Sequence, residues 1–150
     1  MDLKERKTTS DNIDFKKLVA ELDYHLTDFY GEEQDFFDKH NKVDAIRNVI
    51  IIYENDIPIG CGGIKKYSNL IVEIKRMYIK PEYRGQGIAS NILLSLDWAT
   101  KLEYSSTILE TLKAKESVIS IYSKNGYKII PNYGQYENIE SSVCMRKIIN

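Results

Sequence analysis

A glycine-containing hexapeptide, Arg84 to Ala89 (RGQGIA), offers the clearest chemistry in the sequence. It follows a β-branched, apolar segment that is typical of a strand and precedes an apolar repeat that is typical of a helix. The first turn of a helix carries backbone N–H groups without partners, and the helix dipole adds positive charge there. Glycines let the backbone approach an anion closely, and Arg84 can add a charge-assisted hydrogen bond. The hexapeptide therefore predicts a phosphate or pyrophosphate site, and hence a cofactor or a nucleotide.

Two familiar phosphate-binding architectures fit this turn poorly. A P-loop needs Gly-Lys-Ser/Thr, because the lysine and the hydroxyl hold the terminal phosphate and its metal ion. Here Gly87 is followed by Ile88 and Ala89, so the P-loop is excluded. A dinucleotide-binding fingerprint ends in glycine or alanine and belongs at the first strand of a parallel sheet. Here Ser90 stands at that place, and the preceding strand is expected to end an antiparallel meander.

Hydrophobic periodicity predicts the elements that must position this turn. Helices are expected from a cap at Ser10 or Asp11 to a stop at Gly31, then at 32–40, 88–102 and 115–124, and strands at 48–53, 57–65, 70–79, 107–111, 127–130 and 142–148. The first three strands are joined by short turns and should form an antiparallel meander. The strand at 107–111 follows a crossover helix and should pair in parallel with the strand at 70–79. The predicted fold is α+β, with a mixed sheet and helices on its faces.

Composition bounds the class of protein. The chain has 150 residues and a formal net charge of −1, so we expect a single domain, residues 1–150, and no nucleic-acid partner. No apolar run reaches the roughly 20 residues of a membrane span, and the first residues lack the apolar core of a signal peptide. Cys61 and Cys144 are far apart, as expected of reduced, buried thiols in a cytoplasmic protein. Two histidines and two separated cysteines predict no metal site.

The glycine-rich turn matches the Arg/Gln-x-x-Gly-x-Gly/Ala motif of the GNAT superfamily of N-acetyltransferases. The chain resembles bacterial single-domain members of this family most clearly in its second half. The matching segments are EIKRMYI at 73–79, RGQGIA at 84–89, LET at 109–111, IYSKNGY at 121–127 and SVCM at 142–145. The first half resembles the family only in its pattern of helices ahead of a meander. The resemblance implies an acyl-CoA N-acyltransferase fold, with a central mixed and splayed sheet flanked by about four helices.

The resemblance also implies acetyl-coenzyme A as the acyl donor. Its pyrophosphate would be held by the backbone of Arg84, Gly85, Gln86, Gly87, Ile88 and Ala89, with Ser90 next in line. The backbone of Met77 and Ile79 would bind the pantetheine arm and the acetyl carbonyl, while their side chains belong to the core or to the pocket wall. Many family members carry an asparagine seven residues before the tyrosine that corresponds to Tyr122 in this chain. Here that place is Lys115, which we expect to reach a phosphate of coenzyme A instead.

For catalysis, the resemblance implies that the hydroxyl of Tyr122 protonates the departing thiolate. A core tyrosine with a satisfied hydroxyl is the alternative. The reaction needs a base, because an alkylamine is mostly protonated at neutral pH and its deprotonation costs roughly 4.6 kcal/mol. The resemblance implies that Glu73 is this base. The alternative is an exposed strand glutamate that pairs with a lysine; the candidates are Lys65, Lys75 and Lys113. Glu110 is expected to bind substrate or to serve as an alternate base.

The acceptor is expected to contact the N-terminal helices and the last hairpin. These supply Tyr30, Tyr133, Tyr136 and an acidic group made of Glu32, Glu33, Asp35 and Asp38. Such a group attracts a cationic amine of a small molecule, peptide or protein, although a solvated helix face is the more common explanation of such a run. We expect direct acetyl transfer to a primary amine within a ternary complex, by a monomer or a homodimer. A non-catalytic acyl-coenzyme A-sensing module on the same fold is the alternative, and a nucleotide-binding module is a more remote one.

Overall fold

The chain folds into helices and strands in the order that its hydrophobic pattern predicts, with one strand added at the start. The computed structural model describes residues 2–30, 46–101 and 103–150, and only the backbone of 27–30. The elements are β1 Leu3–Thr8, α1 Ile13–Tyr30, β2 Asn48–Glu54, β3 Ile57–Lys66, β4 Ile71–Ile79, η2 Pro81–Tyr83, α3 Ile88–Thr100, β5 Ser106–Leu112, α4 Glu116–Lys124, β6 Lys128–Ile130, η3 Gly134–Tyr136 and β7 Ser142–Ile148. The helix predicted at 32–40 lies outside the described residues.

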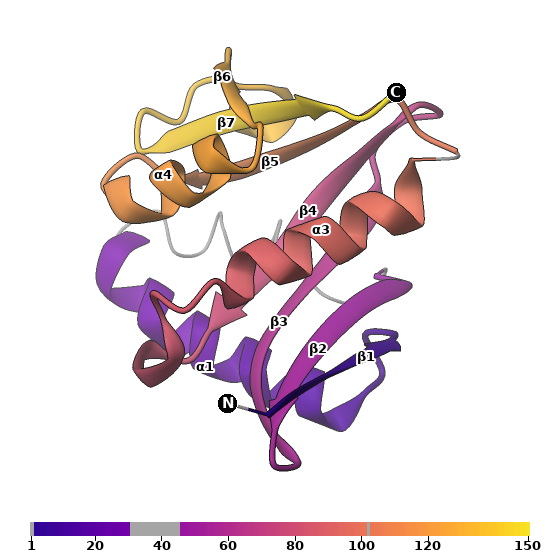
Figure 1. Ribbon diagram of the computed structural model, residues 1–150. Coiled ribbons are helices and arrows are strands. Elements are labelled where there is room, and N and C mark those ends of the chain that lie inside the picture. Colours follow the sequence, from indigo (N-terminus) through magenta and orange to yellow (C-terminus); the bar gives the residue numbers. More distant parts are fainter. Residues whose placement is uncertain (1, 31–45, 102) are drawn as a thin grey trace.

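All seven described strands form one mixed sheet in the order β1-β2-β3-β4-β5-β7-β6. The first four run as an antiparallel meander. β5 pairs with β4 in parallel, and β7 lies between β5 and β6 with antiparallel pairing on both sides. α1 covers one face of the sheet, and α3 and α4 cover the other (Figure 1). The predicted α+β class, the parallel pairing and the final hairpin are thereby confirmed.

The core has two layers, one on each face of the sheet. Under α1, the helically spaced side chains Phe15, Leu18, Val19 and Leu22 pack on the meander, whose buried side chains here include Val49, Ile51, Cys61 and Tyr78. Under α3 and α4 the buried side chains include Ile50, Ile52, Val72, Ile74, Ile88, Ile92, Leu93, Leu96, Leu109, Tyr122, Tyr127 and Met145. The cap of α1 is Asn12, whose Oδ1 accepts the N–H groups of Asp14 and Phe15 at 2.8 and 3.2 Å. The predicted cap at Ser10 or Asp11 was therefore wrong by one or two residues.

β1 is a strand that the hydrophobic pattern does not predict. Its sequence, LKERKT, is largely charged and exposed, and it pairs with β2 from Leu3↔Glu54 to Thr8↔Val49. Leu3 alone in this strand packs against the core under α3. A charged edge strand is a common way to end a sheet, because it discourages pairing with another chain.

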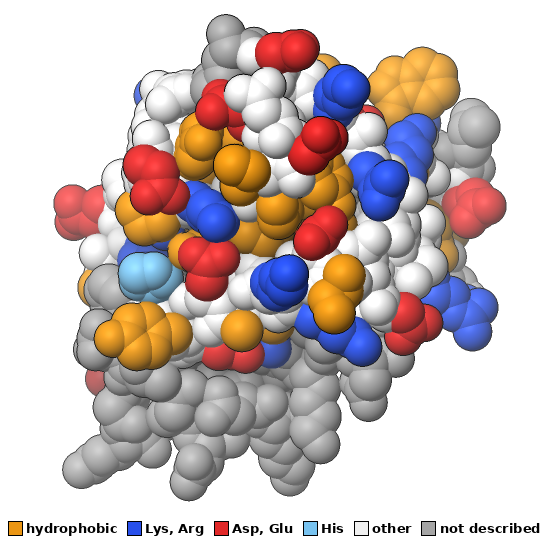
Figure 2. Space-filling model, turned by 90° about the horizontal axis from the view of Figure 1, so that it is seen from below, with side chains coloured by type: hydrophobic (Ala, Val, Ile, Leu, Met, Phe, Trp, Pro, Cys, Tyr) orange, Lys and Arg blue, Asp and Glu red, His pale blue; other side chains and the backbone are white. Residues whose placement is uncertain are grey.

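Charges of both signs are mixed on the surface that Figure 2 shows. This view looks at the end of the molecule that carries the β2–β3 turn, where apolar side chains gather at the centre and acidic and basic side chains surround them. Neither sign dominates this face, in keeping with a net charge of −1. None of the helices described by the structure is long and apolar enough to cross a membrane.

Candidate active site

β4 and β5 pair over a short distance and then separate. Their register contains Ile71↔Ser106, Val72↔Thr107 and Glu73↔Ile108. Beyond these pairs β4 continues to Ile79 and β5 to Leu112, and the two strands diverge toward the side where α3 begins (Figure 1). Backbone groups along such facing edges can hydrogen-bond an extended chain that carries amides. The structure therefore contains the splayed sheet that the resemblance implies.

A β-bulge interrupts β4 at the start of its divergent part. Cys61 pairs with Tyr78, and Gly63 pairs with Lys75. Two steps along β3 therefore correspond to three steps along β4, so β4 contains one extra residue. Arg76, within the bulge, adopts a left-handed φ of 59°. A bulge leaves backbone groups of the extra residue outside the ladder and bends the strand.

The bulge also changes which side chains face α3. Before it, Val72 and Ile74 pack in the core under α3, so Glu73 between them faces the α1 side. After it, Met77 and Ile79 pack against the α3 core, although they are an even number of residues from Glu73. Met77 and Ile79 thus face the α3 side where the sheet diverges, while Glu73 faces the opposite side.

The glycine-rich turn leads into the unprotected N-terminus of α3. Gly85 and Gly87 have φ values of 79° and 82°, a left-handed conformation that favours glycine. Gly87 is the N-cap and provides no side-chain cap, so the first N–H groups of α3 depend on an external acceptor. A Cβ placed on either glycine would meet no atom within 4 Å. Backbone conformation, rather than crowding inside the protein, therefore requires glycine here, and the space in front of the turn is open.

Two cationic side chains lie beside this turn. Arg84 donates from Nε to the carbonyl of Ile79 at 2.8 Å, and its guanidinium lies 5.7 Å from the ring centre of Tyr78. Burial lowers the pKa of Lys115, and the nearby charge of Arg84 lowers it further. An anion between the two cations would relieve this repulsion, which fits a phosphate group. Lys115 is the N-cap residue of α4, so the turn before α3 and the start of α4 both contribute positive charge.

Tyr122 is a buried donor within the layer under α3 and α4. It is 6% exposed, and its ring packs edge-on against Tyr127 at 5.7 Å. Burial, and then the charge of Glu110, raise the pKa of Tyr122 well above its usual value, so the phenol stays protonated. Tyr127 bonds to Thr107 at 2.7 Å, whereas the described residues provide no hydrogen-bond partner for the Tyr122 hydroxyl.

Glu73 is buried and held by two partners on the α1 side of the sheet. It is 6% exposed, its Oε1 lies 3.5 Å from Nζ of Lys75, and its Oε2 accepts a hydrogen bond from the Tyr133 hydroxyl at 2.5 Å. Nζ of Lys75 also lies 3.5 Å from the hydroxyl of Tyr136. Pairing with Lys75 was one of the sequence alternatives, but the exposed setting assumed for it was wrong. Lys75 stands two residues from Glu73, so strand alternation already places both on one face.

Glu110 and Cys144 share this α1-side face, on β5 and β7. The two residues are register partners, and Ser142 donates a hydrogen bond of 2.6 Å to Oε2 of Glu110. Burial raises the pKa of the Cys144 thiol to about 11, with smaller contributions from Glu110 and Glu73. The sequence alone does not show that Cys144 lies beside Glu110, because this depends on the register between β5 and β7.

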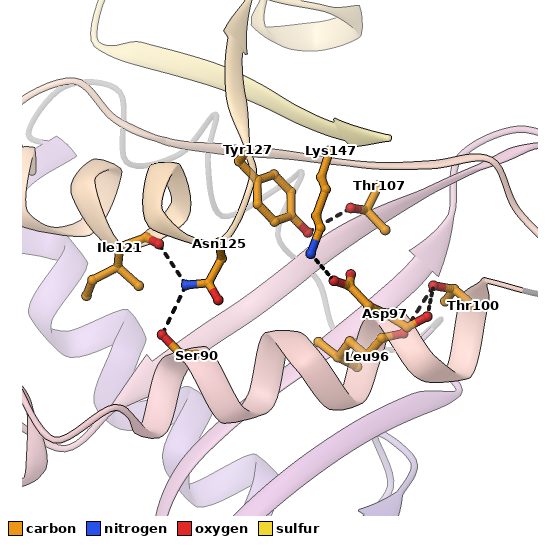
Figure 3. A network of polar contacts seen from close by, with 9 residues as sticks. All are labelled: Ser90, Leu96, Asp97, Thr100, Thr107, Ile121, Asn125, Tyr127 and Lys147. Atoms are coloured by element: carbon orange, nitrogen blue, oxygen red, sulfur yellow. Dashed lines mark hydrogen bonds and ion pairs between the residues drawn. The ribbon is translucent and has the colours of Figure 1, made fainter. Parts of the chain in front are cut away.

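Of the remaining predicted site residues, Tyr136 and Ser90 make contacts within the protein. Tyr136 is 1% exposed and packs with Leu112 and Cys144, so the contact that its hydroxyl makes with Lys75 is internal. The hydroxyl of Ser90 accepts a hydrogen bond from Nδ2 of Asn125 (Figure 3). The side chain of Tyr30 and the acidic group at 32–38 lie outside the described residues.

The family model of the acetyltransferase (GNAT) domain matches residues 45–129, and the chain belongs to this family. It is similar to an IAA acetyltransferase of Azospirillum brasilense, with 28% identity over 134 residues, 87% of this chain and 88% of the relative. Its fold is similar to that of the PaiA N-acetyltransferase of Thermoplasma acidophilum in complex with coenzyme A, with a TM-score of 0.72, 21% identity and 99% of both chains covered. A GNAT family acetyltransferase of Elizabethkingia anophelis with bound acetyl-coenzyme A gives a TM-score of 0.72 at 14% identity, with 97% of both chains covered.

Proposed function

We propose that this protein transfers an acetyl group from acetyl-coenzyme A to a primary amine by direct attack within a ternary complex. The observation that carries the proposal is the divergence of β4 from β5 after Glu73↔Ile108, next to a glycine-rich turn that opens α3 without a side-chain cap. Membership of the GNAT acetyltransferase family supports it. Neighbours of the same fold with bound coenzyme A or acetyl-coenzyme A support the choice of donor.

The donor would lie along the divergent edge of β4 with its pyrophosphate on the turn. The N–H groups from Gly85 to Ser90, helped by Arg84 and Lys115, suit the two phosphates. The carbonyl of Ile79 already accepts a hydrogen bond from Arg84, and a carbonyl oxygen has a second lone pair for a pantetheine amide. Arg84 would therefore connect the phosphate site to the pantetheine site.

In the reaction, the neutral amine attacks the acetyl carbonyl carbon, a C–N bond forms and the C–S bond breaks. The Tyr122 hydroxyl, which is protonated at neutral pH, gives its proton to the departing sulfur. The proton that the amine loses passes to a carboxylate, directly or through water. Because burial raises the pKa of Cys144 to about 11, this thiol stays protonated at neutral pH, which favours direct transfer over an acetyl-cysteine intermediate.

Glu73 is the base that the family resemblance implies, and Glu110 is the second candidate. Glu110 is close enough to Tyr122 for its charge to contribute to the raised pKa of that phenol. Both oxygens of Glu73 are engaged, one by Lys75 and one by Tyr133. Glu73→Gln and Glu110→Gln would separate the two, because the variant that lacks the base should lose the acidic limb of the kcat/KM profile.

Calorimetric titration with acetyl-coenzyme A tests the donor, with Arg84→Ala and Gly87→Asp as weakened variants. If the wild-type protein does not bind acetyl-coenzyme A, the proposed function is wrong. Thiol release with a panel of primary amines, including polyamines, amino acids and short peptides, then tests turnover. Tight binding of the donor without turnover on any amine would point instead to an acyl-coenzyme A-sensing module.

A further inference from the structure

Asn125 joins the end of α4 to the beginning of α3 through its side-chain amide (Figure 3). Its Nδ2 donates hydrogen bonds to Oγ of Ser90 at 3.0 Å and to the carbonyl of Ile121 at 2.8 Å. Ser90 lies in the first turn of α3, directly after the glycine-rich turn. Ile121 precedes Tyr122 in α4. One amide therefore connects the proposed phosphate site to the turn that carries the proposed acid.

The backbone at this position does not explain why an asparagine is present. Asn125 is the C-cap of α4 with φ −96° and ψ 15°, a conformation open to other residues. The left-handed conformation that commonly selects asparagine occurs at Gly126 instead, with φ 93°. The backbone N–H of Asn125 bonds to the carbonyls of Ile121 and Tyr122, as any non-proline residue would. What asparagine adds is an amide with two N–H donors that face two acceptors.

A second polar contact holds α3 to the other half of the sheet. Lys147 of β7 bonds to Asp97 in the last turn of α3 (Figure 3). Asn125 acts near the first turn, so α3 is fixed at both ends against elements that follow β5. Loss of the contact at the glycine-rich end would let the first turn of α3 shift relative to Lys115 and Tyr122, whereas the contact at Asp97 would persist.

We propose that Asn125 is a positioning residue that couples coenzyme A binding to the placement of Tyr122. The inference rests on the proposed function, because the phosphate site and the acid are its two ends. A rigid connection keeps the N–H groups of the first turn of α3 and the side chains of α4 aligned with one ligand at once. By linkage, a ligand that needs this alignment also stabilises the contact between Asn125 and Ser90.

The test is calorimetry with acetyl-coenzyme A on the full chain. Asn125→Ala and Ser90→Ala are each expected to raise Kd by roughly three- to tenfold, the size expected for one lost hydrogen bond. The double variant should bind no more weakly than the weaker single variant, since both substitutions break the same contact. Asn132→Ala is the matched control, because Nδ2 of Asn132 also donates two hydrogen bonds, to the carbonyls of Ile139 and Ser142 at 3.1 and 3.2 Å.

A purely structural role for Asn125 predicts a different pattern. In that case Asn125→Ala and Asn132→Ala would lower Tm alike and leave Kd at the wild-type value, and this result would overturn the inference. Fully additive effects of Asn125→Ala and Ser90→Ala on Kd would overturn it as well. If the wild-type protein does not bind acetyl-coenzyme A, the proposed function fails and the inference fails with it. If the wild-type protein binds and Asn125→Ala binds equally well, the inference alone fails.

Discussion

The hydroxyl of Tyr133 donates a hydrogen bond of 2.5 Å to Oε2 of Glu73, across 60 residues of sequence. Glu73 is the last β4 residue that pairs with β5, and Tyr133 belongs to the loop before β7. The hydrogen bond therefore joins the two halves of the sheet on the α1 side, close to the point where they separate. Asn125 and Ser90 make the corresponding connection on the α3 side.

Tyr133→Phe should lower the free energy of unfolding by about 1.5–3 kcal/mol, because it leaves Oε2 of the buried Glu73 carboxylate without its hydrogen-bond donor. Burial, and then the charge of Glu73, raise the pKa of Tyr133 far above its usual value, so the donor is present at all ordinary pH values. Urea denaturation measures the change. Tyr67→Phe is the control, since the Tyr67 ring packs 5.3 Å from Tyr133 and is 45% exposed. Equal losses in the two variants would contradict the prediction.

The buried pair Glu73–Lys75 should behave as a coupled unit. Removing one partner leaves the other charge buried, so Glu73→Gln and Lys75→Met should each cost about 3 kcal/mol of stability. The double variant should cost less than the sum of the two, because no buried charge of the pair is left behind. A double-mutant cycle by chemical denaturation checks this. Additive losses would mean that the 3.5 Å contact carries no coupling.

Tyr122→Phe should lower kcat by about 10²–10⁴-fold, the usual contribution of a general acid, with little change in Kd for acetyl-coenzyme A. Thiol release under saturating acceptor measures it. Tyr127→Phe is a matched control, because it removes a buried hydroxyl bonded to Thr107 while keeping a ring that packs 5.7 Å from Tyr122. It should lose stability and retain turnover. Wild-type kcat in Tyr122→Phe would remove this residue from the reaction.

Cys61 should make the fold less stable at alkaline pH. Burial raises the pKa of the Cys61 thiol from 9.0 to about 12, so the folded protein keeps a proton that the unfolded chain has lost. The unfolded state then binds fewer protons, and stability present below pH 9 declines as the pH rises toward 12. Unfolding free energies of the wild type and Cys61→Ala, compared across this range, should converge as the pH rises. A constant difference between the two would exclude this contribution.

The sequence predicts the glycine-rich turn and most of the elements around it, because their signals are local. Asn55 and Asp56, for example, close the predicted hairpin with positive φ values of 49° and 68°. The bulge at Arg76 was not predicted, since it depends on how β3 and β4 pair rather than on residue type. The α1-side cluster was only partly anticipated. Strand alternation places Lys75 beside Glu73, but the approach of Tyr133 and Cys144 depends on register between distant strands.

β1 has a consequence for the behaviour of the chain in solution. It covers β2, whose sequence NVIIIYE is rich in β-branched residues and would expose a long row of unpaired backbone groups if β1 were removed. Trimming the chain before Thr9 should therefore convert a sealed sheet edge into an aggregation-prone one, without any change at the glycine-rich turn. Light scattering of the full and trimmed chains at equal concentration measures this difference. The charged residues of β1, which conceal the strand from hydrophobic periodicity, are therefore expected to keep the protein dispersed.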